Sequence, residues 1–275
     1  MGAFGPIVSP EWLREHVGDP DLRVIDFRWY LMGAKGSDAY ERGHIPGAVF
    51  VDLEAVTGKE GGGRHPLPTG EQFEKEMQKA GIGPQTGVVA YDDAGGSIAS
   101  RLWFLLRFFG HESQAVLDGG LAAWGAPLET HEPSLARGSF QSHEPDRSGI
   151  VNFEDVRKLS GVPVIDARAG ERYRGEKEPI DPKAGHIPGA LSAPWAENLG
   201  PEGRFKSPGE LRKRFAELGI SDETGAVAYC GSGVNATHDL LAMELAGIKN
   251  GRLYAGSWSD WSSRDAAVAT GKDPG

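Results

Sequence analysis

Short apolar runs alternate with longer amphipathic or apolar segments along this chain of 275 residues. The short runs are rich in Val, Ile and Ala, as in Val24-Ile-Asp26 and Ala226-Val-Ala-Tyr229, and they predict buried β-strands. The longer segments predict helices at residues 70–80, 98–109, 208–218 and 237–246. Because strands that alternate with helices favour a parallel sheet, the pattern predicts an α/β fold with helices flanking each sheet.

The pattern occurs twice, because several motifs recur after about 140 residues. Gly43-His-Ile-Pro-Gly-Ala48 returns unchanged as Gly185-His-Ile-Pro-Gly-Ala190. Asp26-Phe-Arg28 likewise corresponds to Asp166-Ala-Arg168. A duplication explains this order of matches, so each half of the chain is expected to fold in the same way.

The composition between the copies indicates the domain boundaries. Residues 133–149 are rich in Pro, Ser, Gly and charged residues, which predicts a linker on the surface. We therefore expect one domain at residues 1–132 and a second at residues 150–275, each large enough to bury a core of its own.

The single cysteine, Cys230, is the strongest chemical signal in the chain. It ends a predicted strand and begins a glycine-rich stretch before a predicted helix, and ligands of open parallel sheets bind at such strand ends. Backbone N–H groups and the positive end of the helix dipole there favour a thiolate, which predicts a nucleophile. We expect Gly231 and Gly233 to allow the tight backbone curve that points these N–H groups inward.

Composition excludes several other classes of site. One cysteine cannot form an internal disulfide or a zinc site of two or four cysteines, and the residues imply no metal or organic cofactor. The formal net charge of -10 argues against a general nucleic-acid surface. We find no secretory leader pattern and no apolar stretch of membrane-spanning length, and a reduced cysteine fits a cytoplasmic protein without membrane contact.

The cysteine loop also admits other interpretations. Residues 231–236 fit the G-x-G-x-x-G/A pattern of dinucleotide-binding loops, although no acidic residue follows about 20 residues later to hold a ribose. A cysteine phosphatase would need an arginine where this chain has Ala236. A buried cysteine with a purely structural role is the third alternative. In the first copy Asp92 stands in place of Cys230, which predicts that this copy is catalytically inactive and serves as scaffold and pocket wall.

The doubled motifs and the cysteine loop resemble the two-domain sulfurtransferases of the rhodanese superfamily over nearly the whole chain. The resemblance implies tandem rhodanese-like domains, with an inactive first copy, an active second copy and a site between them. It implies that Cys230 takes sulfur from thiosulfate or 3-mercaptopyruvate as a persulfide and gives it to cyanide, a thioredoxin-like protein or a low-molecular-weight thiol. A persulfide carrier that serves one protein partner is the alternative function.

The resemblance also implies which residues bind the small anionic sulfur donor. Arg172 matches the arginine that binds the anionic group, whereas Asp181 stands where 3-mercaptopyruvate enzymes usually have a second arginine. The uncharged residues after the cysteine favour a donor with less charge than thiosulfate. The predicted donor-binding residues are Trp29, Arg172, Gly231, Gly233, Val234 and Asn235.

A polar triad is implied in the same way. Asp52 and His65 match an Asp and a His that act with the serine two residues after the cysteine, here Ser232. A neutral imidazole there would relay a proton to a departing enolate, although His65 alternatively anchors its loop, and packing is the alternative for Trp29. His44 and His186 occur in both copies, which favours a structural role in turns.

Overall fold

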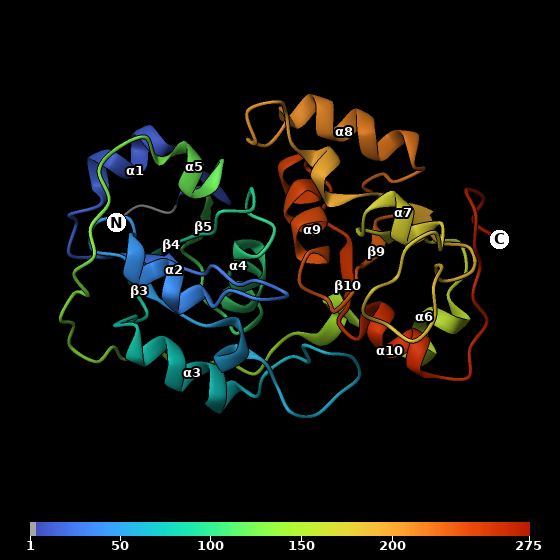
Figure 1. Cartoon of the computed structure of the whole chain (residues 1–275), viewed down its shortest axis with the longest axis horizontal. Helices are drawn as coiled ribbons and strands as arrows, with labels where there is room; N and C mark the ends of the chain where they lie inside the picture. Colours follow the sequence, from blue (N-terminus) through green and yellow to red (C-terminus); the bar gives the residue numbers. More distant parts are fainter. Residues whose placement is uncertain (1–3) are drawn as a thin grey trace. The chain divides into compact units, whose positions relative to one another are not determined.

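The computed structural model describes residues 4–275, which form two compact units (Figure 1). The first unit contains residues up to 58, 68–145 and 202–204, and the second contains 59–67, 146–201 and 205–275. Each unit holds one five-stranded sheet in which all the pairings are parallel, and this confirms the predicted α/β fold. The loop at 59–67 therefore groups with the second unit, although it lies in the first half of the sequence.

The first unit has helices on both faces of its sheet. Its strands follow the order β1-β5-β4-β2-β3 and are β1 (Ile7–Val8), β2 (Leu22–Asp26), β3 (Val49–Phe50), β4 (Gly87–Tyr91) and β5 (Gln114–Leu117). Its helices are α1 (Pro10–His16), α2 (Gly36–Arg42), η1 (Leu53–Val56), α3 (Gly70–Lys79), α4 (Ala99–Phe108) and α5 (Gly120–Trp124). Leu13 of α1 and Trp124 of α5 pack with Val89 on one face. Helix α4 packs against β4 and β5, and Phe73 of α3 stacks on Phe109, which follows α4, at 4.9 Å.

The second unit repeats this arrangement. Its strands follow the order β6-β10-β9-β7-β8 and are β6 (Ile150–Val151), β7 (Val164–Asp166), β8 (Leu191–Ser192), β9 (Ala226–Tyr229) and β10 (Gly251–Tyr254). Its helices are η2 (Arg147–Gly149), α6 (Phe153–Lys158), α7 (Gly170–Tyr173), η3 (Trp195–Asn198), α8 (Pro208–Glu217), α9 (Ala236–Leu245) and α10 (Ser257–Ser263). Phe153 of α6 and Trp258 of α10 pack with Val227 of β9 in the core.

The four predicted helices are confirmed to within one residue, as α3, α4, α8 and α9. Two of them begin at side-chain caps that the sequence encodes. The Thr69 hydroxyl accepts a hydrogen bond from the Gln72 N–H at 3.2 Å, and Ser207 and Glu210 form a capping box at the start of α8. The shorter helices were not predicted, because segments of three to seven residues carry too little periodicity.

The two repeated motifs meet in a buried network at the end of β2. Arg28 Nη2 donates to Asp26 Oδ2 at 2.5 Å and to the Gly43 carbonyl at 2.8 Å. The Tyr91 hydroxyl donates to the same carboxylate at 2.7 Å. Burial, with Asp26 next to the hydroxyl, raises the pKa of Tyr91 far above its usual range, so the phenol stays a donor. The network joins two strand ends to the turn that begins at Gly43.

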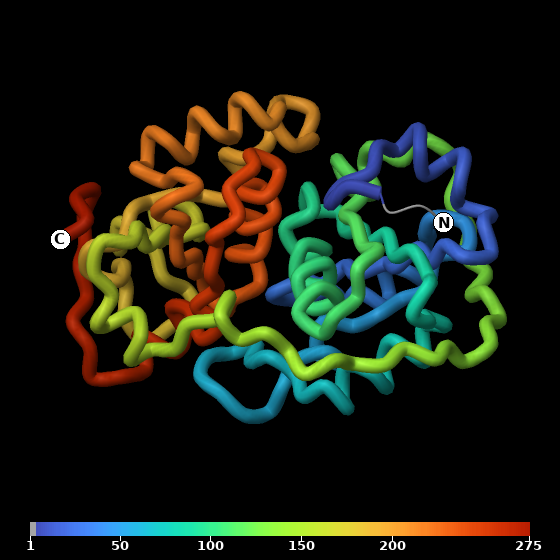
Figure 2. Tube along the Cα trace, turned by 180° about the vertical axis from the view of Figure 1, so that it is seen from behind, coloured from blue at the N-terminus to red at the C-terminus, as the bar shows by residue number. Residues whose placement is uncertain are grey.

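The second unit contains the same network. Arg168 Nη2 donates to Asp166 Oδ2 and to the Gly185 carbonyl, each at 2.6 Å, and burial raises the pKa of Tyr229 well above its usual value. His186 stacks on Tyr173 at 3.8 Å and pairs with Ala269 of the C-terminal segment, which Figure 2 shows in red along one side of this unit. These contacts give the turn histidine the structural role that its repetition predicted.

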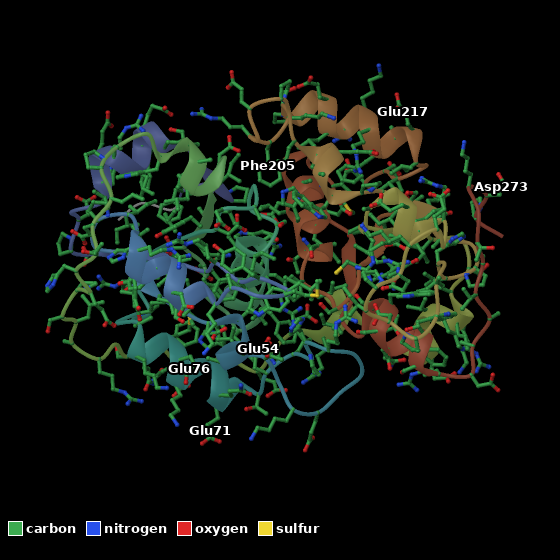
Figure 3. All side chains as sticks on the ribbon, in the orientation of Figure 1. Glu54, Glu71, Glu76, Phe205, Glu217 and Asp273 are labelled. Atoms are coloured by element: carbon green, nitrogen blue, oxygen red, sulfur yellow. The ribbon has the colours of Figure 1, made fainter. Side chains whose placement is uncertain are left out.

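Asp239 is a buried carboxylate within α9. It accepts a hydrogen bond from Asn198 Nδ2 at 2.6 Å, and the same nitrogen lies 3.1 Å from His238 Nδ1. The His238 ring stacks on Phe205, labelled in Figure 3, at 4.5 Å. Burial raises the pKa of Asp239 from 3.8 to about 7, although Arg214 and Asn198 lower it. The folded protein therefore holds a proton here that the unfolded chain releases near pH 4.

We predict that this group lowers the free energy of unfolding as the pH rises from about 4 to about 7, by up to about 1.4 kcal/mol per pH unit. Asp239→Asn keeps an acceptor for Asn198 and removes the proton release. The variant should match the parent protein at pH 4 and be more stable at pH 8, as measured by thermal unfolding across this range. Asp265→Asn, at an exposed position, is the control. A variant that follows the parent at every pH would contradict the assignment.

Candidate functional site

Cys230 lies at the carboxyl end of β9, where the chain enters the loop before α9. The thiol is free, and the residue is 2% exposed. Its N–H donates to Ser257 Oγ at 3.1 Å, and its carbonyl accepts from the Trp258 N–H at 2.9 Å. Ser257 has a φ of 53°, and backbone strain of this kind often occurs at functional sites. The first turn of α10 therefore fixes the backbone of the cysteine.

The two loop glycines have different roles. Gly233 has a φ of 79°, and a Cβ there would run into the Ala255 carbonyl, as expected for a tight curve. The φ of Gly231 is not positive, so that part of the expectation is wrong. A Cβ on Gly231 would instead lie 2.9 Å from Arg64 Nη2 and 3.4 Å from Arg172 Nη1. Gly231 therefore leaves room beside the cysteine loop for the ends of the two arginine side chains.

The remaining loop residues lead into α9. Val234 is buried, and its carbonyl accepts a hydrogen bond from the Thr237 hydroxyl at 2.6 Å. Asn235 precedes the first residue of α9 but makes no side-chain cap. Val234 thus anchors the loop to the helix, whereas the Asn235 amide is not used for capping.

The loop at 59–67 reaches the cysteine loop of its own unit through three consecutive glycines. Gly63 has a φ of 84°, and a Cβ on Gly62 or Gly63 would collide with Asp260 or the Gly256 carbonyl. The N–H of Arg64 donates to Ser259 Oγ at 3.0 Å. The missing side chains let the loop lie directly on α10, which brings the two residues after the glycines to the cysteine loop.

His65 and Ser232 are brought together as the sequence predicted. His65 Nδ1 and Ser232 Oγ form a hydrogen bond of 2.8 Å, and the two residues are 4% and 8% exposed. A buried imidazole bonded to a hydroxyl two residues from a thiol can hold or move a proton there.

The other two predicted site residues, Asp52 and Trp29, belong to the first unit. Asp52 caps η1 by accepting from the Glu54 N–H at 3.0 Å, and the Trp29 indole donates to Glu54 Oε1 at 3.1 Å.

Arg172 lies in a charged cluster beside the cysteine loop. Its Nη2 donates to Glu178 Oε1 at 2.7 Å and to Asp181 Oδ2 at 3.2 Å. Asp181 also forms an ion pair with Arg64 Nη1, and Glu178 accepts from Arg168 Nη1 at 3.2 Å. Burial, with Glu178 nearby, raises the pKa of Asp181, while Arg64 and Arg172 lower it. Asp181 therefore joins two arginines in the second unit.

Arg64 is a site residue that the sequence analysis missed. It lies 166 positions before Cys230, and no spacing rule connects it with Asp181. The one available signal was the run Gly61-Gly62-Gly63 before Arg64-His65, because consecutive glycines often mark a close approach of backbones.

Within residues 4–275, no group of three or more His, Cys, Asp or Glu side chains is placed to hold a metal ion. No helix in the same range is long and apolar enough to cross a bilayer.

The corresponding loop of the first unit holds a carboxylate in a cradle of amides. Asp92 Oδ1 accepts from the N–H groups of Ala94 and Gly96 at 2.9 and 2.8 Å. Its Oδ2 accepts from Ile98 and Ala99 at 2.7 and 2.8 Å. Burial raises the pKa of Asp92, and these four amides lower it. The duplicated loop can thus direct several N–H groups at one acidic side chain that follows the strand.

Both copies match one family model, described as Rhodanese-like domain, at residues 9–127 and 152–264. A Pseudomonas aeruginosa protein named Probable 3-mercaptopyruvate sulfurtransferase is 44% identical over 281 residues, which cover 96% of this chain and 98% of that one. A Mycobacterium tuberculosis protein named Putative thiosulfate sulfurtransferase SseB is 38% identical, with coverage of 90% and 89%. The crystal structure of SseA from Escherichia coli, described as a 3-mercaptopyruvate sulfotransferase, superposes with a TM-score of 0.83 at 35% identity, covering 93% of this chain and all of that chain.

We predict that Asp92→Asn destabilises the protein by about 2–3 kcal/mol, because its amide NH₂ would face N–H donors that now have an acceptor. Chemical unfolding at neutral pH measures the effect. Asp93→Asn is the matched control, because Asp93 is exposed and its bond from the Tyr30 hydroxyl needs only an acceptor oxygen. Equal stability of the two variants would show that the amide cradle contributes little.

Proposed function

The chain belongs to the rhodanese family and is a sulfurtransferase, and on this premise we propose that Cys230 accepts sulfur from 3-mercaptopyruvate and passes it to a thiol or to cyanide. One observation carries the proposal. The only cysteine lies at the carboxyl end of a central strand, next to the buried hydrogen bond between His65 and Ser232. The cytoplasmic location of the protein and the identity of its physiological sulfur acceptor stay predictions from the sequence.

The choice of donor rests on charge. Residues 231–234 carry no charged side chain, and thiosulfate is a dianion, whereas 3-mercaptopyruvate carries a single carboxylate. The charged cluster beside the loop contains three cations and three anions, so its charges balance: Arg64, Arg168 and Arg172 with Asp166, Glu178 and Asp181. A neutral site accommodates a monoanion at a lower desolvation cost than a dianion. The name of the Pseudomonas relative supports the same donor.

The sulfur transfer has two steps. The Cys230 thiolate attacks the donor sulfur, a sulfur–sulfur bond forms, and the carbon–sulfur bond breaks with its electron pair moving to the enolate of pyruvate. The enolate takes one proton to become pyruvate, and the protein keeps the transferred sulfur as a persulfide. In the second step an acceptor thiolate or cyanide attacks the outer sulfur and releases the Cys230 thiolate. The amide cradle around Asp92 supports a similar role for the loop amides, which would stabilise the anionic sulfur.

His65 and Ser232 would supply the proton for the enolate. Their hydrogen bond is buried, so the pair could deliver a proton beside the cysteine loop away from bulk water. A sulfite leaving group needs no such proton, because sulfite departs from thiosulfate as a stable anion. Comparing the rates with the two donors therefore distinguishes a defect in proton transfer, which affects only 3-mercaptopyruvate, from a defect in sulfur transfer, which affects both.

Steady-state assays with each donor, and cyanide as acceptor, test the function. We expect many turnovers, a kcat/KM for 3-mercaptopyruvate at least about tenfold above that for thiosulfate, and no activity in Cys230→Ser. A preference for thiosulfate would overturn the donor. A protein that gains one sulfur atom by intact mass but does not turn over with either donor would instead be a carrier.

We predict that His65→Gln lowers kcat for 3-mercaptopyruvate by about 10²- to 10⁴-fold and changes the rate with thiosulfate far less. The ratio of the two rates is the measurement, and the thiosulfate rate serves as an internal control for folding. An equal loss with both donors would mean that His65 positions the loop and does not transfer the proton.

A further inference from the structure

We infer that Arg64 binds the carboxylate of the sulfur donor together with Arg172. The inference rests on the proposed function for the identity of the donor, and on contacts within the second unit for the residue. It adds to the site a residue that lies outside both the cysteine loop and the segment around Arg172.

The unpaired side of the Arg64 guanidinium lies at the cysteine loop. Its Nη1 is occupied by Asp181, Nε is buried without a hydrogen-bond partner, and Nη2 makes no hydrogen bond within residues 4–275. Nη2 lies 2.9 Å from the position that a Cβ of Gly231 would take. These two nitrogens form the side edge of a guanidinium, which binds a carboxylate through two parallel N–H···O bonds. This edge therefore has the chemistry of a carboxylate site one residue from Cys230.

Arg172 presents its remaining nitrogen at the same place. Its Nε and Nη2 are occupied by Glu178 and Asp181, and Nη1 lies 3.4 Å from the absent Cβ of Gly231. Two guanidinium groups so close together would repel each other if no carboxylate were paired with them. Asp181 is that carboxylate for both, because it pairs with Arg64 and with Arg172. Arg64 Nη2 and Arg172 Nη1, the two nitrogens nearest Gly231, make no hydrogen bond with the described residues.

A structural role alone does not account for Arg64. The ion pair with Asp181 uses only Nη1, and the loop itself is held by the Arg64 backbone N–H on Ser259 Oγ. The Arg64 side chain is 28% exposed, whereas that of Asp181, which pairs with Arg64 Nη1, is 3% exposed. Asp181 is accordingly a positioning residue, and Arg64 is the residue that contacts the donor.

Alkylation of Cys230 tests the carboxylate site without any turnover. Iodoacetate and iodoacetamide have nearly the same shape, but only iodoacetate carries a carboxylate. We expect Arg64→Gln to lower the ratio of the iodoacetate rate to the iodoacetamide rate about tenfold or more, and Arg64→Lys to give an intermediate ratio, because lysine keeps the charge without the planar fork. Arg174→Gln is the matched control, because it removes one positive charge from the same unit, where Arg174 pairs with Glu176.

Single-turnover formation of the persulfide with 3-mercaptopyruvate is the second measurement. Arg64→Gln should raise the donor concentration for half-maximal rate by about 10- to 100-fold and change the limiting rate by less than about threefold. Thermal unfolding shows whether Arg64→Gln has kept its fold. If it has not, the alkylation ratio and the half-maximal donor concentration of Arg64→Lys decide instead. An alkylation ratio and a half-maximal concentration within about twofold of those of Arg174→Gln would overturn the role of Arg64. If the parent protein formed no persulfide, the proposed function would fail, and the alkylation ratio would still decide whether Arg64 binds a carboxylate.

Discussion

A carboxylate buried at the end of a central strand must be neutralised, and each unit is built around that requirement. Asp26 and Asp166 are fully buried, and each is paired with an arginine two residues later that also binds the turn beginning at Gly43 or Gly185. Removing one partner from such a pair costs about 3–5 kcal/mol, because the other charge remains buried and unpaired. The strand end and the turn therefore cannot separate without a large penalty, and both copies have retained the same residues.

In the second unit the pairing continues beyond the turn and reaches the cysteine loop. Arg168 contacts Glu178, Glu178 contacts Arg172, Arg172 contacts Asp181, and Asp181 contacts Arg64. Charges of opposite sign alternate along this row, so that each group satisfies its neighbours and the last one, Arg64, keeps donors for a ligand. Because the row starts at the fold's own anchor, the orientation of the arginines at Gly231 follows from the requirement that holds the sheet together.

The sequence predicted the repeated features well and the contacts between distant segments poorly. Strands, the four long helices and the place of Cys230 follow from periodicity and from glycines after a strand, which are local signals. The pairing of His65 with Ser232 followed only from resemblance to a family. Arg64 was missed because its partner Asp181 is remote in sequence, and Asp181 itself was noted only as a departure from the family pattern. The reason for Gly231 was also wrong, because the space beside a backbone depends on side chains that come from elsewhere.

The loop at 59–67 changes what the duplication means for this protein. Two copies of a gene begin as interchangeable parts, and either can be lost while the other survives. Here the half that keeps the cysteine has its histidine and one of its arginines supplied by a loop encoded in the other half. A gene shortened to residues 150–275 would retain Cys230 and Arg172 but neither of those side chains. The half that carries the thiol therefore depends on the other half for side chains that lie beside its cysteine loop.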